Sequence, residues 1–298
     1  MNAVPAPRNI AASIRQRLLN RARVNGEDFQ LLLDRYAVER FLYRLSVSNV
    51  RDEFLLKGAL LFTLWFNAAY RPTRDADFLG YGPRDGEALA RTIRRICAIE
   101  CEDGIAYDPD SIKVVEIREH ASYQGLRATL RAELDRARCT LQLDVGYGDA
   151  VTPAPVDITF PGLLDDLPAP ALRAYPRETV FAEKLEAIAQ LGIANSRMKD
   201  YFDLWALARE GAMDTRALGK AITATFNRRE TPLPASMPVG LTTSFSEDAQ
   251  KRRQWNAFVT RNRLGAPALN AVVEVLATFV EEPLKQAHAA VRNAKARE

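Results

Sequence analysis

Two aspartates one residue apart, Asp75 and Asp77, lie in a segment that otherwise has the pattern of a short strand. Residues two apart on a strand project from the same face, so both carboxylates should point together while Phe78 turns toward a core. A third acid, Asp144, lies on the polar face of the strand-like run 141–146. Three carboxylates on one patch repel each other unless a divalent metal neutralises them. The spacing therefore predicts a Mg²⁺ or Mn²⁺ site built from Asp75, Asp77 and Asp144.

A glycine turn precedes the first of these strands. Lys57-Gly58-Ala59 leads into the apolar run 60–66, a pattern typical of a helix that begins after a tight turn. The backbone N–H groups at such a helix start can bind a phosphate. A phosphate site beside metal-binding carboxylates suits nucleotidyl transfer, in which a hydroxyl attacks the α-phosphorus of an NTP and pyrophosphate leaves.

The elements around these residues predict an α/β (α+β) fold with a mixed sheet flanked by helices. Helical spacing covers residues 8–50 and about 86–99, whereas β-type patterns fill 112–118, 123–134 and 139–145, with a further short strand at 156–160. A helix followed by several adjacent strands argues against a doubly wound parallel sheet. We therefore expect N-terminal helices and a nucleotidyltransferase catalytic domain over residues 1–165.

The second half of the chain has a different composition. Six prolines between Pro153 and Pro176 mark a linker or wrapping loop. Beyond it, apolar residues recur at helical spacing, which predicts a C-terminal helical bundle over residues 175–298 with helices at about 178–191, 199–209, 215–227, 247–261 and 267–293. The segment 231–246 is rich in Pro, Ser and Thr and is expected to be an exposed loop.

Composition excludes several classes of protein. The chain has 298 residues, three cysteines and two histidines, so no zinc set can be assembled. No apolar stretch approaches the roughly 20 residues needed to span a bilayer, and no secretory signal is visible at the N-terminus. We expect a cytoplasmic protein without a membrane partner.

The net charge of +3 is too small to argue nucleic-acid binding by itself. Arginine clusters could nevertheless line a groove for a phosphate backbone, although a solvated face is the better interpretation of any single cluster. The cationic residues considered for RNA contact are Arg127, Arg131, Arg136, Arg138, Arg228, Arg229, Lys251, Arg252 and Arg253.

Five motifs occur in an order that resembles the AbiEii/AbiGii toxin family of nucleotidyltransferase-like proteins, which has tRNA-modifying members. The motifs are Lys57-Gly58, then 71–77, 143–149, 182–185 and 197–204, and the resemblance runs from about residue 30 to 265. It implies a fold similar to that of DNA polymerase β, with Asp75 and Asp77 as metal ligands. One departure concerns Ala59, because the family commonly has Gly or Ser there and a phosphate-binding hydroxyl is lost.

The resemblance also implies functional positions in the helical half, at Lys184 and Asp200. Lys184 could hold a triphosphate as a point charge or snorkel from a solvated face. Asp200 and Asp203 are three residues apart on one helix face, so both could face the same site, or one could cap the helix. The expected substrate-binding residues are Lys57, Gly58, Ala59, Arg74, Lys199 and Asp203.

Three functions remain open at this point. The first is an NTP-dependent nucleotidyltransferase toxin of a toxin–antitoxin or phage-defence (abortive-infection) pair, with the tRNA 3′ end as acceptor and a cognate antitoxin encoded nearby. The second keeps the reaction but transfers the nucleotide to a protein or small-molecule hydroxyl. The third is a nucleotide-binding regulatory module without turnover, for which Ala59 is the support.

Overall fold

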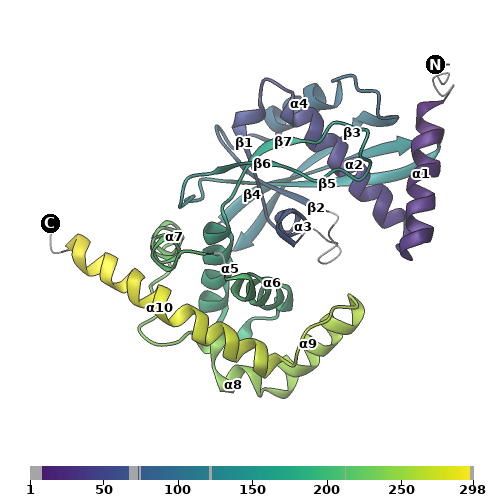
Figure 1. Ribbon diagram of the computed structural model, residues 1–298. Coiled ribbons are helices and arrows are strands. Elements are labelled where there is room, and N and C mark those ends of the chain that lie inside the picture. Colours follow the sequence, from purple (N-terminus) through teal and green to yellow (C-terminus); the bar gives the residue numbers. More distant parts are fainter. Residues whose placement is uncertain (1–8, 67–72, 74, 121–122, 212, 296–298) are drawn as a thin grey trace. The chain divides into compact units, whose positions relative to one another are not determined.

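The structure is a computed structural model that describes residues 9–66, 73, 75–120, 123–211 and 213–295 (Figure 1). The chain divides into two compact units. Unit 1 consists of Met1–Gly148 and Asp157–Ala174, and unit 2 consists of Asp149–Val156 and Tyr175–Glu298. Each unit is described separately.

Unit 1 is built on a seven-stranded mixed sheet with the order β3-β4-β5-β2-β1-β7-β6. The strands are β1 Phe54–Lys57, β2 Asp75–Gly80, β3 Ile105–His120, β4 Tyr123–Leu134, β5 Ala137–Tyr147, β6 Val156–Thr159 and β7 Ala171–Ala174. The pairs β3/β4, β4/β5 and β1/β2 are antiparallel, whereas β2/β5 and β1/β7 are parallel. The predicted mixed α/β fold is therefore confirmed.

A two-residue turn sets the register of the hairpin β4–β5. Asp135 and Arg136 have φ angles of 43° and 67°. Positive φ at both central residues is characteristic of the type I′ turn, whose twist matches that of the flanking strands. The turn pairs Leu134 with Ala137, and the register continues to the opposite end of the hairpin. This register brings Arg127 of β4 opposite Asp144 of β5.

Four helices accompany the sheet: α1 Ile10–Asn25, α2 Phe29–Ser46, α3 Leu60–Phe66 and α4 Gly86–Cys97. Side-chain carboxylates cap two of them, Asp28 at α2 and Asp85 at α4, each accepting a backbone N–H three residues on. α2 packs against β5 and β7, and α4 packs against β3. One sheet face, which includes Phe78, is buried, and this leaves the opposite face of β2 for the paired aspartates.

Unit 2 is helical, as predicted. Its helices are α5 Arg177–Leu191, α6 Met198–Glu210, α7 Thr215–Arg228, α8 Thr243–Ser246, α9 Ala249–Arg261 and α10 Leu269–Lys295. α5 packs against α6 and α7, while α10 runs along α6, α7 and α8. Among the described residues, no helix combines the length and the apolar character that crossing a bilayer requires.

Two expectations about connecting segments are wrong. The segment 231–246 is not an exposed loop throughout, because its end forms a 3₁₀ turn, Val239–Leu241, and α8. Phe245 is fully buried and stacks on Tyr201, whose hydroxyl donates to the Gly240 carbonyl at 3.0 Å. The proline-rich linker also contributes a sheet strand, β7, which lies parallel to β1.

The segment Asp149–Val156 groups with unit 2. The Thr179 hydroxyl donates to the Thr152 carbonyl at 2.8 Å, and the Thr152 N–H donates back to the same hydroxyl at 3.0 Å. Tyr175 and Arg229 both contact Asp149. These polar contacts attach the segment to the helical unit.

Candidate active site

Asp75 and Asp77 lie on one face of β2, as predicted, and both are half-buried. The residue between them, Ala76, is fully buried on the opposite face. Asp77 is paired with Lys57 of β1 on one side and with Asp144 of β5 on the other. Residues directly opposite in neighbouring strands point to the same face of a sheet.

These pairings form a row of charged residues across four strands, here called the charge row. From β1 to β4 it consists of Lys57, Asp77, Asp144 and Arg127. Asp75 belongs to the neighbouring row, opposite Gln142. The sheet therefore places the three predicted carboxylates on one face of two neighbouring strands, with a cationic residue at each end of the row.

The backbone of Gly58 lies close against the side chain of Asp77. Its φ of +73° is in the left-handed region that favours glycine. A Cβ at this position would collide with the Asp77 carboxylate and lie 2.7 Å from its Cγ. The glycine turn predicted upstream of the aspartates is therefore the element that makes room for the Asp77 side chain.

Asp144 is held by Arg127 in a bidentate ion pair. The Arg127 Nε donates to Oδ1 at 2.8 Å and Nη2 donates to Oδ2 at 2.7 Å. Asp144 is buried, whereas the Arg127 side chain is 38% exposed. The hydrogen bond to Asp144 raises the pKa of Arg127 against the opposing effect of burial, and the charges of Asp75 and Asp77 raise it further. Arg127 thus lies within the field of all three carboxylates.

The chemistry of this donor set suits a hard divalent cation. Mg²⁺ and Mn²⁺ prefer carboxylate oxygens, and Asp75 and Asp77 present theirs on one face beside the close-fitting Gly58. Within the described part of the chain, no three acidic, histidine or cysteine side chains are close enough together to hold a metal ion. The third expected ligand, Asp144, has both oxygens engaged by Arg127.

The expected phosphate-binding residues lie at the start of α3. Lys57 is buried, with 6% of its surface exposed, on the same face as Asp77. Gly58 and Ala59 form the turn directly before α3, and their carbonyls accept the N–H groups of Leu61 and Phe62 at 3.4 and 3.2 Å, respectively. Arg74, also expected to bind substrate, lies outside the described residues.

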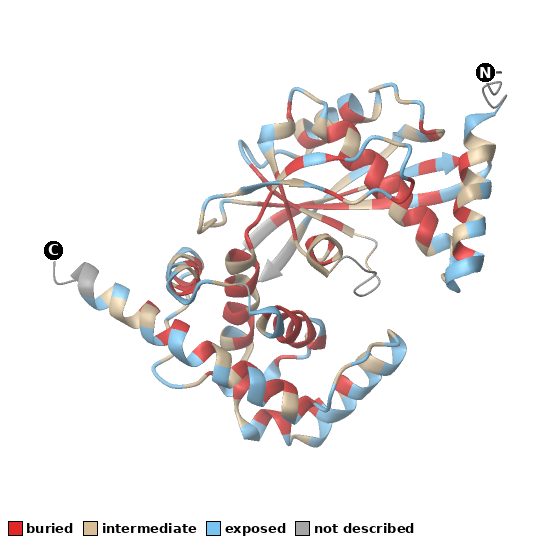
Figure 2. Cartoon of the chain, viewed as in Figure 1, coloured by how far each residue is buried: buried red, intermediate tan, exposed pale blue. Residues whose placement is uncertain are grey.

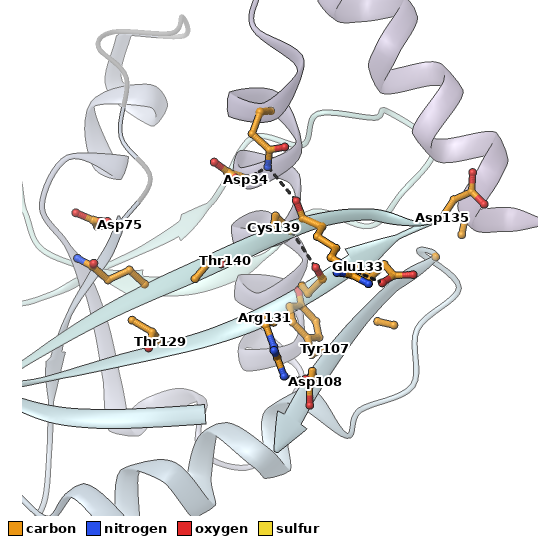
Figure 3. A pocket seen from close by; sticks show the side chains of 17 residues that line it. Asp34, Asp75, Tyr107, Asp108, Thr129, Arg131, Glu133, Asp135, Cys139 and Thr140 are labelled. Atoms are coloured by element: carbon orange, nitrogen blue, oxygen red, sulfur yellow. Dashed lines mark hydrogen bonds and ion pairs between the residues drawn. The ribbon is translucent and has the colours of Figure 1, made fainter. Parts of the chain in front are cut away.

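A cavity of about 1080 Å³ is lined by Asp75 of the three predicted carboxylates (Figure 3). Figure 3 shows Asp75 and Thr129 at one end and Asp135 near the other, with the ion pair of Arg131 and Asp108 between them. The remaining acidic lining residues are Asp34 and Glu133. Acids outnumber arginines in this cavity, so its lining does not favour a polyanion.

The residues predicted in the helical half form a buried ion cluster within unit 2. Lys184 Nζ lies 2.8 Å from Oδ1 of Asp200 and 2.8 Å from Oδ2 of Asp203, and both carboxylates are fully buried. Arg197 Nε lies 2.6 Å from the second oxygen of Asp200. Burial alone raises the pKa of Asp200, but the charges of Lys184 and Arg197 outweigh burial and lower this pKa to about 2.

Two details of this cluster refine the interpretation from sequence. The Lys184 side chain is only 12% exposed, so it does not snorkel from a solvated face. Lys199, in contrast, is exposed and makes no ion pair within the residues that the structure describes. Lys184 therefore has a structural task, the neutralisation of two buried carboxylates, beside the role that the resemblance implies.

Most of the cationic residues considered for RNA contact are engaged by the protein itself. In unit 1, Arg131 pairs with Asp108 at 2.7 Å and Arg138 with Glu133 at 3.6 Å, in addition to the Arg127 pair. In unit 2, Arg229 is largely buried and lies within 4 Å of the carboxylates of Glu186, Glu183 and Asp149. Lys251 is buried as well, and its Nζ donates to the Asn195 carbonyl at 2.9 Å.

Arg127 is a member of the site that the sequence analysis considered only for RNA contact. A signal for its place was present in the sequence. A two-residue turn at Asp135-Arg136 puts residues 127 and 144 opposite each other by counting outward from the turn. Arg127 then faces Asp144 because paired residues share a face.

Comparisons with known structures agree with this fold. The structure is similar to that of JHP933 from Helicobacter pylori, with a TM-score of 0.52, 17% sequence identity, and coverage of 90% of this chain and 98% of that one. A second H. pylori structure, provisionally described as a nucleotidyltransferase, gives a TM-score of 0.51 and 17% identity, with 88% and 98% covered. At this identity the likeness shows the fold. No curated protein matches the chain.

The family is shown by sequence. Residues 40–282 match the family described as nucleotidyl transferase AbiEii toxin, type IV toxin–antitoxin system. The chain belongs to this AbiEii family and is a nucleotidyltransferase, as the resemblance implied. A toxin of a toxin–antitoxin system also implies an antitoxin as its partner.

Proposed function

We propose that the chain transfers a nucleoside monophosphate from an NTP to the 3′-hydroxyl of tRNA, with Mg²⁺ bound by Asp75 and Asp77. The charge row carries this proposal, because it aligns Asp77 with a buried lysine on one side and an arginine-held acid on the other. When bound, the metal would neutralise phosphate charge and lower the barrier to attack on the α-phosphorus.

The residues of the chain would act as follows. Asp75 and Asp77 would hold the cation, and Lys57 with the Gly58-Ala59 turn would contact the triphosphate from the β1 side of the same face. The acceptor oxygen forms a bond to the α-phosphorus while the bond to the pyrophosphate oxygen breaks, and the acceptor's proton leaves to solvent or to a carboxylate of the site. Asp144 keeps a fixed orientation because Arg127 donates to both of its oxygens.

Lys184, Asp200, Asp203 and Lys199 stay part of the proposal on the strength of the resemblance. Within unit 2, the first three form one ion cluster, so a change at any of them alters the charge balance of the others. A test of their function must therefore measure folding beside activity. Neutralisation by an antitoxin and a setting in phage defence belong to the same proposal and are testable by co-expression and by phage challenge.

The direct experiment is incubation of the protein with Mg²⁺, each α-labelled NTP in turn, and unfractionated tRNA. We expect label in the RNA, none after chelation of the metal, and none with Asp77→Asn. Label in protein instead would move the acceptor to a protein hydroxyl. NTP binding without any transfer would leave a regulatory module and end the proposal of turnover.

A further inference from the structure

The helix α9 and the segment after it carry an unbalanced positive charge. From Ala249 to Val273 the sequence contains five basic residues and no aspartate or glutamate. Here the term α9 arm denotes residues 249–266. The acids nearest its start are Glu247 and Asp248, and Asp248 caps the helix by accepting the N–H groups of residues 250 and 251 at 2.8 and 2.9 Å.

One side of the α9 arm is fixed to the body of unit 2. Lys251 and Trp255 are buried there, and the Trp255 indole N–H donates to the Pro267 carbonyl at 2.9 Å. Phe258 packs edge-on against Phe202 of α6, with ring centroids 6.1 Å apart. Figure 2 shows exposed residues along the rest of this helix. The arm therefore consists of an anchored helix and a short segment after it, and its remaining residues are largely open to solvent.

The arm carries four exposed arginines, Arg252, Arg253 and Arg261 on α9 and Arg263 just after its end. Within the described part of the chain, none of the four forms an ion pair, in contrast to Arg127, Arg131, Arg138 and Arg229. The first and third are nine residues apart, which corresponds to about 13 Å along a helix. Exposed Asn256 lies between the two pairs and adds an amide donor.

This chemistry favours a nucleic-acid backbone over a protein or a membrane, and the proposed function makes that nucleic acid RNA. Guanidinium groups bind phosphate through paired donors, and amide side chains commonly supplement such contacts. A protein interface would be expected to have an apolar or aromatic centre, and a membrane-binding helix an apolar face. The α9 arm exposes no large hydrophobic residue.

We propose that the α9 arm is the RNA-backbone-binding element of this protein, with Arg252, Arg253, Arg261 and Arg263 contacting phosphates. The inference rests on the proposed function, since it identifies how the tRNA acceptor is held. The sequence analysis considered nine cationic residues for RNA contact, and this inference names four arginines. Arg252 and Arg253 were among the nine, whereas Arg261 and Arg263 were not. The arm binds the backbone without reading sequence, so different tRNAs should bind with similar affinity.

Fluorescein-labelled unfractionated tRNA is titrated with the full chain at several KCl concentrations. The test variants are R252E/R253E and R261E/R263E. The matched control is R216E/K220E on α7, which reverses two exposed charges of the same unit that have no ion pair among the described residues. Each test variant should weaken binding by about tenfold or more at low salt and flatten the slope of log K against log salt by roughly 1–2. The control should stay within about twofold of wild type.

Equal binding by the α9 variants and the control would overturn the inference, as would absence of tRNA binding by the wild type. A loss in the control as large as in the test variants would show a non-specific effect of net charge and overturn it too. Asp77→Asn separates the two proposals, because it should bind tRNA normally while transferring no label. Binding through α9 without NTP-dependent labelling would refute the proposed function alone. Labelling that needs Asp77 but not the arginines would refute the inference alone.

Discussion

Arg127 engages both carboxylate oxygens of Asp144, at 2.8 and 2.7 Å, in the row that also contains Asp77. A guanidinium in this position competes with a metal ion for the same acid. Two of the three carboxylates, Asp75 and Asp77, are therefore the principal candidates for metal binding. The protein supplies a fixed cation for the third.

This pair predicts opposite effects of two substitutions on metal affinity. Arg127→Met removes a cation that lies in the field of Asp75 and Asp77, so Mn²⁺ should bind more tightly. Asp77→Asn removes a ligand and should abolish most of the binding. Asp144→Asn should change the affinity little compared with Asp77→Asn. Calorimetric titration of the nucleotide-free protein with Mn²⁺ measures all three.

Arg127→Met should also lower the free energy of unfolding of unit 1. Arg127→Met leaves the buried Asp144 without its partner, and we expect unit 1 to lose about 1–3 kcal/mol. Urea unfolding provides the measurement.

If Asp144→Asn reduced the Mn²⁺ affinity as strongly as Asp77→Asn does, Asp144 would be a metal ligand and the argument that Arg127 competes with the metal would be wrong.

The close fit of Gly58 against Asp77 gives a second prediction. Gly58→Ala introduces left-handed strain of about 1–2 kcal/mol and a Cβ that collides with the Asp77 carboxylate. Nucleotidyl transfer should fall by orders of magnitude. Gly26→Ala is the matched control, since Gly26 has a φ of +64° and no atom within 4 Å of the added Cβ. It should lose similar backbone stability and keep its activity.

Local pattern was sufficient to predict much of this site. Alternation on β2 placed Asp75 and Asp77 on one face, and the tight turn at Gly58 followed from its sequence context. The ion pairs depend on which strands become neighbours, and that is a tertiary property. The sequence spacing gives no direct sign that Arg229 would be surrounded by Glu183, Glu186 and Asp149, because the two glutamates of α5 and Asp149 are all distant from Arg229 in the sequence.

In the fold, too, local elements could be predicted from the sequence, whereas tertiary contacts could not. The long amphipathic helices and the hairpin strands were predicted because their periodicity is local. The strand β7 is four residues long and lies among prolines, so its pairing with β1 was not visible. Phe245 was assigned to a polar loop because its neighbours are Ser and Thr, but stacking on Tyr201 buries it.

The ion cluster of unit 2 predicts that Lys184 is important for folding. Lys184→Ala would leave Asp200 and Asp203 buried with less compensation, and breaking such a pair costs about 3–5 kcal/mol. Lys220→Ala on α7 removes an exposed lysine and should change stability by less than about 0.5 kcal/mol. If Lys184→Ala and Lys220→Ala had the same midpoint of urea unfolding, Lys184 would make no net contribution to stability.

The lowered pKa of Asp200 predicts how stability depends on pH. The carboxyl has a pKa of about 2 in the folded chain against 3.8 as its ordinary value, so the folded state favours the ionised form. The ionised Asp200 contributes roughly 2 kcal/mol to the free energy of unfolding. This contribution is present above about pH 4 and is lost as the pH falls toward 2. In Asp200→Asn the decline in unfolding free energy between pH 4 and 2 should be smaller by this amount. Glu247→Gln, which alters an exposed acid of the same unit, should retain the wild-type decline. Parallel curves for Asp200→Asn and wild type would show that Lys184 and Arg197 do not hold this carboxylate in its ionised form.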